Sequence, residues 1–144
     1  MRMHVIGTES AEGALLPGMT GSPLSRASRA WIDGGLVDDL TEIGAEVELI
    51  SFPALEPGAA TDDRVANLGE LNARIAGTVS GALNDGAFPL LAGGTCNHLN
   101  GMLSGLQAHL GATARIGLLW LDAHGDFNTP STSLSQMLGG MPVA

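Results

Sequence analysis

The stretch that decides both fold and site is LLWLDAHGDFNTP, residues 118–130. Apolar residues 118–121 run directly into Asp122, and His124 and Asp126 follow at alternate positions. A short apolar run of this kind predicts a buried strand, here residues 116–123. In an extended segment, alternate side chains point to the same side. The three polar side chains are therefore predicted to converge just beyond the end of that strand.

This alternation of acid, imidazole and acid predicts a metal site. Two carboxylates on one side of a segment repel each other unless a cation lies between them. Mixed oxygen and imidazole ligands suit manganese, zinc or iron. The alternative is a solvated loop in which the pattern is coincidental, but the apolar strand before it favours the site.

Working outward, apolar runs alternate with helical patterns along the chain. Strands are predicted at residues 3–8, 45–52 and 88–92, and helices at 24–40, 61–83 and 97–109. In the first helix Ala27, Ala30 and Trp31 share one side, and Gly34–Gly35 break it. Thr61 is the predicted N-cap of the second helix. The order predicts an α/β fold, a three-layer parallel sheet with helices on both faces, forming one domain over residues 1–144.

A second strand is also followed by unusual residues, in GGTCNH, residues 93–98. Sites in parallel sheets form beyond the carboxyl ends of the strands, so Cys96 is predicted to lie near Asp122. The alternative is a tight turn in which Thr95 or Asn97 caps the following helix and Cys96 is a small buried hydrophobe. At this point both interpretations remain open.

Composition excludes several classes of protein. The net charge is −9 with no basic cluster, which argues against nucleic acid or an anionic membrane as partner. The same charge is compatible with a cationic substrate or with ordinary acidic solubility. A single cysteine cannot form an internal disulfide, and neither a signal peptide nor a membrane span is evident. We therefore expect a cytoplasmic protein. GGTC does not match the GxGxxG pattern of dinucleotide binders.

The motifs resemble those of the arginase–agmatinase–formimidoylglutamase family, the ureohydrolases. LDAHGDFNTP is similar to the family's DAHxDxNTP, the Gly93–Gly94 turn to the start of GGDHS, and GGMPVA to HGMP. The resemblance covers nearly the whole chain but only the N-terminal half of the family domain. It implies an arginase-like fold that is incomplete at the C-terminus.

The resemblance also implies roles for the site residues. Asp122 would bridge two manganese ions, Asp126 would bind one of them and accept a proton in catalysis, and His124 would bind the other. Asn128 and Ser135 match positions that contact the polar tail of the substrate. The implied reaction is hydrolysis of a guanidino or amidino C–N bond of a small cationic compound, with water activated by the metal ions.

The chain departs from the family pattern at several positions. Cys96 stands where the family has its first histidine ligand, and this soft thiolate shifts the expected metal from manganese toward zinc or iron. Gly139 replaces the histidine of HGMP, and the family's later DxD is missing. We expect a ureohydrolase-like hydrolase that needs the C-terminal half, supplied by a homo-oligomer or a complementing segment. The alternative is a non-catalytic metal-binding or structural family member.

Overall fold

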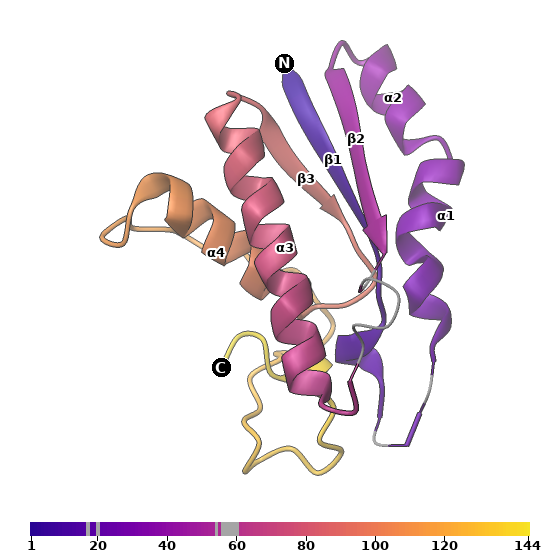
Figure 1. The fold of residues 1–144 in the computed structure, drawn as a ribbon, viewed down its shortest axis with the longest axis vertical. Helices are drawn as coiled ribbons and strands as arrows, with labels where there is room; N and C mark the ends of the chain where they lie inside the picture. Colours follow the sequence, from indigo (N-terminus) through magenta and orange to yellow (C-terminus); the bar gives the residue numbers. More distant parts are fainter. Residues whose placement is uncertain (17, 20, 54, 56–60) are drawn as a thin grey trace.

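A parallel sheet forms the centre of the molecule, in a computed structural model that describes residues 1–16, 18–19, 21–53, 55 and 61–144. Within these residues the strands are β1 (Arg2–Glu9), β2 (Glu46–Pro53) and β3 (Phe88–Ala92), in the order β2-β1-β3 (Figure 1). Ile6 of β1 lies opposite Ile50 of β2 and Leu91 of β3. The first three predicted strands are confirmed, and their carboxyl ends lie at one edge of the sheet.

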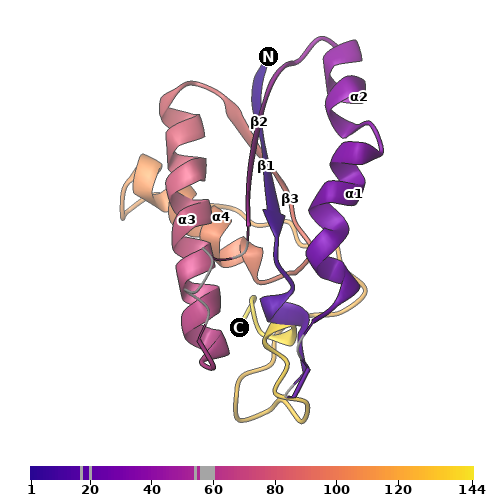
Figure 2. The same cartoon turned by 45° about the vertical axis from the view of Figure 1, so that its right-hand side comes forward.

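Helices cover both faces of this sheet, so the predicted three-layer α/β architecture is confirmed (Figure 2). One face carries α1 (Ala27–Asp33) and α2 (Leu36–Glu42), and the other carries α3 (Arg64–Asn84) and α4 (His98–Leu110). The predicted break at Gly34–Gly35 separates α1 from α2, where Gly35 has a φ of 100°, a conformation that glycine adopts without strain. Short 3₁₀ turns occur at η1 (Glu12–Ala14), η2 (Pro23–Arg26) and η3 (Leu138–Gly140).

The hydrophobic core lies between β1 and α3. Ile6 packs with a stripe on α3 at the predicted helical spacing, formed by Leu68, Leu71, Ile75 and Val79. These side chains are almost completely buried, and Leu71, Ile75 and Val79 have no exposed surface. Apolar burial of this kind stabilises a fold by about 1.5–3 kcal/mol per large side chain. The long amphipathic helix predicted from the sequence is therefore confirmed as the main core element.

Two glycines let α4 approach α3 closely. A Cβ at Gly101 would lie 2.7 Å from the Cβ of Ile75, and one at Gly105 would lie 2.6 Å from the Cβ of Val79. Gly101 and Gly105 are four residues apart and therefore lie on one face of α4. The amide of Gly101 also donates a hydrogen bond to Asn72 Oδ1 at 3.2 Å. The separation of the two helices is therefore set by the absence of side chains at these positions.

The first testable prediction concerns this helix contact. Gly101→Ala should destabilise the chain by about 1–3 kcal/mol, because the added methyl group overpacks the contact with Ile75. Gly77→Ala on the open side of α3, where a Cβ would meet nothing within 4 Å, is the matched control and should stabilise by about 0.5–1 kcal/mol. Urea unfolding followed by circular dichroism measures both. Equal effects of the two substitutions would contradict the packing account.

The apolar residues that share one side of the first helix are not the ones that α1 buries most deeply. Trp31 is 60% exposed, whereas Ser28 is 1% exposed and faces the sheet. The reason is the small residue on β1: a Cβ at Gly7 would lie 2.6 Å from Ser28 Oγ and 3.3 Å from Ile32 Cδ1. The face of α1 that packs against the sheet therefore carries a serine, which periodicity of apolar residues does not detect.

The predicted N-cap of α3 is also wrong by two residues. Asp63 is the cap, and its carboxylate accepts hydrogen bonds from the amides of Val65 at 2.9 Å and Ala66 at 3.0 Å. Thr61 lies before the cap, where its amide donates to Asn67 Oδ1 at 2.9 Å. The negative charge of Asp63 also favours the positive end of the helix dipole, which makes aspartate the better cap here.

The fourth predicted strand, residues 116–123, does not form. These residues have no regular secondary structure, and Leu119 and Leu121 are 82% and 87% exposed. An apolar parallel strand needs hydrogen-bonded neighbours and a covering layer on both faces. In the described residues neither is present beside this segment, because the sheet consists of β1–β3 and α4 packs against α3. The apolar run alone therefore does not produce a strand.

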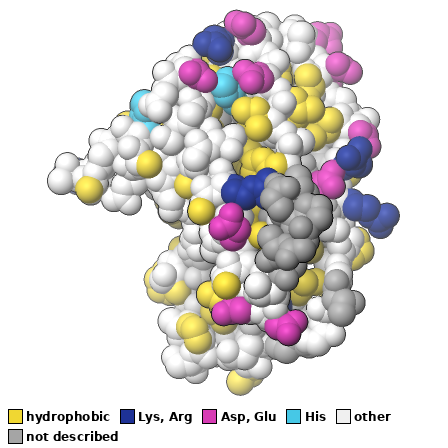
Figure 3. Space-filling model, viewed as in Figure 1, with side chains coloured by type: hydrophobic (Ala, Val, Ile, Leu, Met, Phe, Trp, Pro, Cys, Tyr) yellow, Lys and Arg dark blue, Asp and Glu magenta, His cyan; other side chains and the backbone are white. Residues whose placement is uncertain are grey.

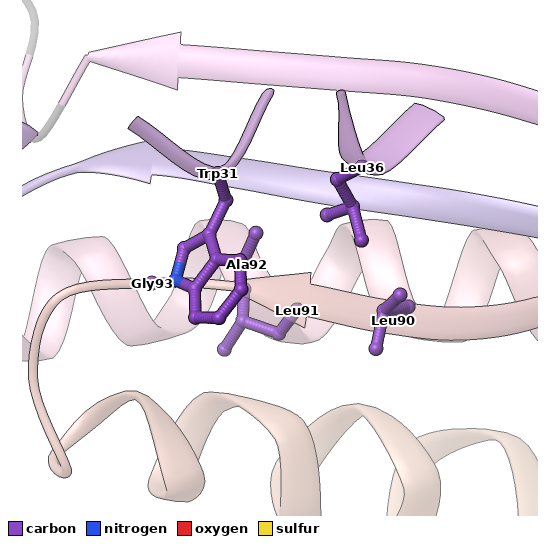
Figure 4. A pocket seen from close by; sticks show the side chains of 6 residues that line it. All are labelled: Trp31, Leu36, Leu90, Leu91, Ala92 and Gly93. Atoms are coloured by element: carbon purple, nitrogen blue, oxygen red, sulfur yellow. The ribbon is translucent and has the colours of Figure 1, made fainter. Parts of the chain in front are cut away.

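Apolar surface is exposed at several other places. On the face shown in Figure 3, apolar side chains form separate exposed groups, with acidic and basic side chains dispersed between them. A hollow of about 260 Å³ lies beside β3, and it is lined by Trp31 and Leu36 from the helices and by Leu90 and Leu91 from the strand (Figure 4). Among the helices that the structure describes, none is long and apolar enough to span a membrane.

The second prediction follows from this exposed surface. The purified chain should self-associate, because burying apolar side chains such as Leu121 between molecules removes them from water. Leu121→Lys should shift sedimentation-velocity profiles toward the monomer. Thr113→Lys, which adds the same charge at an exposed polar position, should leave the profile unchanged. A chain that sediments as a monomer at all concentrations would argue against this prediction.

Candidate metal centre

The turn between β3 and α4 places Cys96 at the carboxyl edge of the sheet. Two glycines make this turn possible, because any side chain at their positions would overlap neighbouring atoms. A Cβ at Gly94 would collide with the carbonyl oxygen of Leu24, and one at Gly93 would collide with the ring of His98. The C-terminal segment lies on the side of the molecule toward which the strands point (Figure 1). Cys96 and the Asp122–Asp126 segment therefore meet there.

The structure brings together three of the four predicted metal ligands. Cys96, Asp122 and Asp126 each offer one ligand atom, and these atoms all lie within 4.8 Å of one another. The Cys96 thiol lies 3.7 Å from Asp122 Oδ2, to which it donates a hydrogen bond. A thiol and two carboxylates in this arrangement form a donor set for a divalent cation. The prediction that Cys96 lies near Asp122 is confirmed, although residues 116–123 before Asp122 form no strand.

Asp126 is the buried member of this cluster. It is 8% exposed, and its Oδ2 has no hydrogen-bond partner in the part of the chain that the structure describes. Its φ of 48° lies in the left-handed region, which is uncommon outside glycine and costs conformational energy. A buried carboxylate oxygen without a partner is strongly unfavourable unless a cation or proton compensates for it. Asp126 is therefore oriented as a ligand would be.

Asp122 and His124 form a local pair. Asp122 Oδ1 accepts a hydrogen bond from the amide of His124 at 2.9 Å, and the His124 ring nitrogen Nδ1 lies 3.2 Å from the same oxygen. The backbone hydrogen bond is the main reason that the pKa of Asp122 lies below its usual value. Asp122 therefore stays ionised at neutral pH, with its second oxygen directed to Cys96.

His124 itself does not join the cluster. Its side chain is 81% exposed and contacts Asp122 instead. Alternate side chains share one side only in an extended segment, but the backbone bends at residues 123 and 124. The expected convergence therefore holds for Asp122 and Asp126 and is wrong for His124. Its role as a metal ligand remains a prediction.

Burial and two neighbouring carboxylates together raise the pKa of the Cys96 thiol to about 11. Burial is the largest cause, and a hydrogen bond and charge repulsion from Asp126 come next. Deprotonation would place a third negative charge beside Asp122 and Asp126. Without a cation the thiol is therefore protonated at neutral pH, whereas a bound divalent cation would favour the thiolate.

A pocket of about 460 Å³ adjoins the cluster and contains both predicted substrate-binding residues. Asn128 and Ser135 line it together with Cys96, His124 and Asp126. The backbone of Asn128 is fixed by a 3.0 Å hydrogen bond from its amide to Gly140 O. Further lining residues that the sequence did not single out as site residues are Ala14, Leu24, Gly94, Ser133, Met137 and Gly140. These residues are small, apolar or hydroxyl-bearing, and no sequence motif identifies such residues as part of a pocket.

The surroundings of Asn97 and His98 in this turn differ from those expected for a helix cap. Asn97 occupies the N-cap position of α4, but its side chain makes no capping hydrogen bond and donates instead to Leu138 O at 2.8 Å. His98 is 2% exposed, and burial lowers its pKa to about 4. It is therefore neutral at physiological pH and packs against Gly93. The sequence predicts Thr95 or Asn97 as the N-cap and gives no sign that Asn97 contacts a segment 41 residues away.

Comparison with known proteins assigns the family. The model of the arginase family matches residues 29–144 of this chain. The chain belongs to the arginase family. The arginase of Bacillus caldovelox is 41% identical over 86 residues, which are 58% of this chain and 28% of that protein. The arginase of Bacillus subtilis (strain 168) is 34% identical over 113 residues, which are 76% and 37%.

Solved structures of arginases share the fold. The crystal structure of the arginase from Bacillus subtilis superimposes with a TM-score of 0.82 at 26% identity. The match covers 100% of this chain and 46% of that chain. The resemblance to the ureohydrolases and the arginase-like fold predicted from the motifs are confirmed. The chain spans less than half the length of these relatives.

The third prediction concerns the thiol of this arginase-family site. Asp126→Asn should lower the pKa of Cys96, because it removes the largest contribution after burial. In the metal-free chain the alkylation rate should then rise at lower pH than in the wild type. Cys96 is the single cysteine, so labelling by iodoacetamide followed by mass spectrometry reports it alone. Asp33→Asn, on α1, is the control, and an unchanged pH profile for Asp126→Asn would refute the charge account.

Proposed function

We propose that this chain provides the metal-binding part of a ureohydrolase-type active site that hydrolyses a guanidino or amidino C–N bond. The observation that carries the proposal is the cluster of Cys96, Asp122 and Asp126 opening into the pocket with Asn128 and Ser135, in a chain of the arginase family. Family membership supports the reaction class, and the cluster supports metal dependence.

The residues present fit a divalent cation. Asp126 Oδ2 is buried without a partner among the described residues, and the Cys96 thiol lies close to the carboxylates of both Asp122 and Asp126. Cys96, Asp122 and Asp126 would hold the ion. Manganese is the metal that family membership favours, whereas the soft thiolate favours zinc or iron. A bound divalent cation would supply Lewis-acid activation of a water at neutral pH.

The chain's own residues would bind and orient the substrate. The carboxylates of Asp122 and Asp126 attract a positively charged guanidinium into the pocket. Asn128 and Ser135 offer hydrogen bonds to a polar tail farther from the cluster. Asp126, whose buried Oδ2 has no hydrogen-bond partner among the described residues, is the group that would accept a proton from the attacking water. The exposed His124 would hold Asp122 in place through their 3.2 Å contact.

We also propose that activity needs more polypeptide than this chain. Three ligand atoms leave coordination positions open, and the chain corresponds to 46% of the Bacillus subtilis arginase structure. The remaining part would come from a complementing segment or from a second copy in an oligomer. The exposed apolar side chains of residues 118–121 are compatible with such an assembly.

One observation favours a second function, that of a non-catalytic metal-binding member of the family. Gly139 lines the pocket where the family motif has a histidine, and His124 lies outside the cluster. Glycine has no side chain that could move a proton, and the His124 ring is not held among the cluster ligands. In that case the chain would bind metal with the same residues but would not turn over guanidino compounds in any assembly.

The fourth prediction tests the proposed function. Native mass spectrometry of the purified chain with Mn²⁺ or Zn²⁺ should show a bound ion. Asp126→Asn should weaken binding by more than about tenfold, since even outer-shell changes reach that size. Asp33→Asn is the matched control. Amine and urea release from a panel of guanidino compounds is then measured with the chain alone and with the C-terminal part of Bacillus subtilis arginase added.

Each outcome has a distinct meaning. Metal binding together with turnover in the complemented sample supports the hydrolase. Metal binding without turnover supports the non-catalytic alternative. A chain that binds no divalent ion under any of these conditions would contradict both functions.

A further inference from the structure

We propose that Asn97 is a positioning residue that fixes the distance between Cys96 and Asp126 by tying the β3–α4 turn to the C-terminal segment. This inference deepens the proposed metal site and rests on it. The observation behind it is a buried side-chain amide that does not cap the helix on which it lies. Asn97 is 3% exposed at the N-cap position of α4, yet it makes no capping hydrogen bond.

The side chain of Asn97 is directed across the molecule. Its Nδ2 donates a 2.8 Å hydrogen bond to the carbonyl oxygen of Leu138 in η3. Because a carbonyl can only accept, the nitrogen must face Leu138, which fixes the orientation of the amide. Oδ1 then faces Gly13 of η1, where a Cβ would collide with it. Three segments distant in sequence, η1, η3 and the start of α4, therefore meet at one carboxamide.

The segment that Asn97 holds is bonded to Asp126. The amide of Asn128 donates to Gly140 O at 3.0 Å, and the amide of Val143 donates to Asp126 O at 3.1 Å. These bonds pair residues 126–128 with residues 140–143. Movement of η3 would therefore be passed directly to the backbone of Asp126, whose φ of 48° is already unusual.

The other end of this connection is the thiol ligand. Cys96 is the neighbour of Asn97 in the turn, and α4 is fixed against α3 through Gly101 and Gly105. One carboxamide therefore links the segment carrying Cys96 to the segment carrying Asp126. Between these segments the loop of residues 129–136 forms hydrogen bonds within itself, such as the bond from Gln136 Nε2 to Pro130 O. Those bonds do not fix the distance between Cys96 and Asp126.

The test separates local positioning from overall stability. Asn97→Asp keeps the shape but replaces the donor with an acceptor that faces Leu138 O. Gly13→Ala disturbs the same carboxamide from the opposite side. Asn100→Asp, an exposed position in the same helix, adds the same charge and is the matched control. Hydrogen exchange followed by mass spectrometry is measured on the metal-free full chain for all three variants.

We expect both Asn97→Asp and Gly13→Ala to accelerate exchange in residues 126–143 by about tenfold or more while α3 stays protected. In a second measurement, Zn²⁺ titration should show affinity reduced by roughly 10–100-fold, the usual effect of an outer-shell contact. Asn100→Asp should change neither quantity. If Asn97→Asp unfolds the chain and exposes α3, Gly13→Ala provides the same comparison.

The possible failures are distinguishable. Unchanged exchange in residues 126–143 would overturn the link itself, whatever the metal result. Faster exchange with unaltered Zn²⁺ affinity would overturn the positioning role. A wild-type chain that binds no Zn²⁺, Mn²⁺ or other divalent ion would refute the proposed metal function, and the exchange result would still decide whether Asn97 holds η3.

Discussion

The close contact between α3 and α4 is the constraint on which the site depends. Gly101 and Gly105 let α4 lie directly on Ile75 and Val79, so the start of α4 has a fixed position. The end of β3 is fixed by its pairing with β1. The turn between them is therefore held at both ends. This turn contains Cys96. The position of a candidate metal ligand is thus decided by helix packing in the core.

The cluster that results is unfavourable by itself. It holds two carboxylates beside a thiol, with Asp126 buried and in a left-handed backbone conformation. Burial and the acids keep the thiol of Cys96 protonated at neutral pH. One divalent cation would compensate the repulsion and the burial of these groups, since it neutralises the carboxylates and favours the thiolate. This conflict of charges is the strongest physical support for metal binding.

Much of the fold could be predicted from the sequence. Residues 2–9 and 88–92 carry short apolar runs between turns, and α3 carries a helical stripe, so local patterns were sufficient. Residues 118–121 have an equally clear pattern but remain exposed, because a parallel strand depends on neighbours that a local pattern does not contain. Trp31 is exposed for a related reason: the contact of α1 with the sheet is made by Ser28.

The site was predicted in part. Cys96 was predicted to lie near Asp122 because parallel strands end at one edge of the sheet. The two residues do lie close together, although residues 116–123 before Asp122 form no strand. The separation of His124 from the cluster depends on bends at residues 123 and 124, which alternation in the sequence does not reveal. The contact of Asn97 with Leu138 joins residues 41 positions apart and has no local signal.

The most direct test of the central claim is the absorption spectrum of the chain titrated with Co²⁺. Binding by Cys96, Asp122 and Asp126 predicts a thiolate-to-cobalt charge-transfer band that saturates with added metal and is lost in Cys96→Ser. A saturable Co²⁺ spectrum that is identical in the wild type and Cys96→Ser would show that the thiol is not a ligand. The absence of any saturable spectrum would contradict the metal centre as a whole.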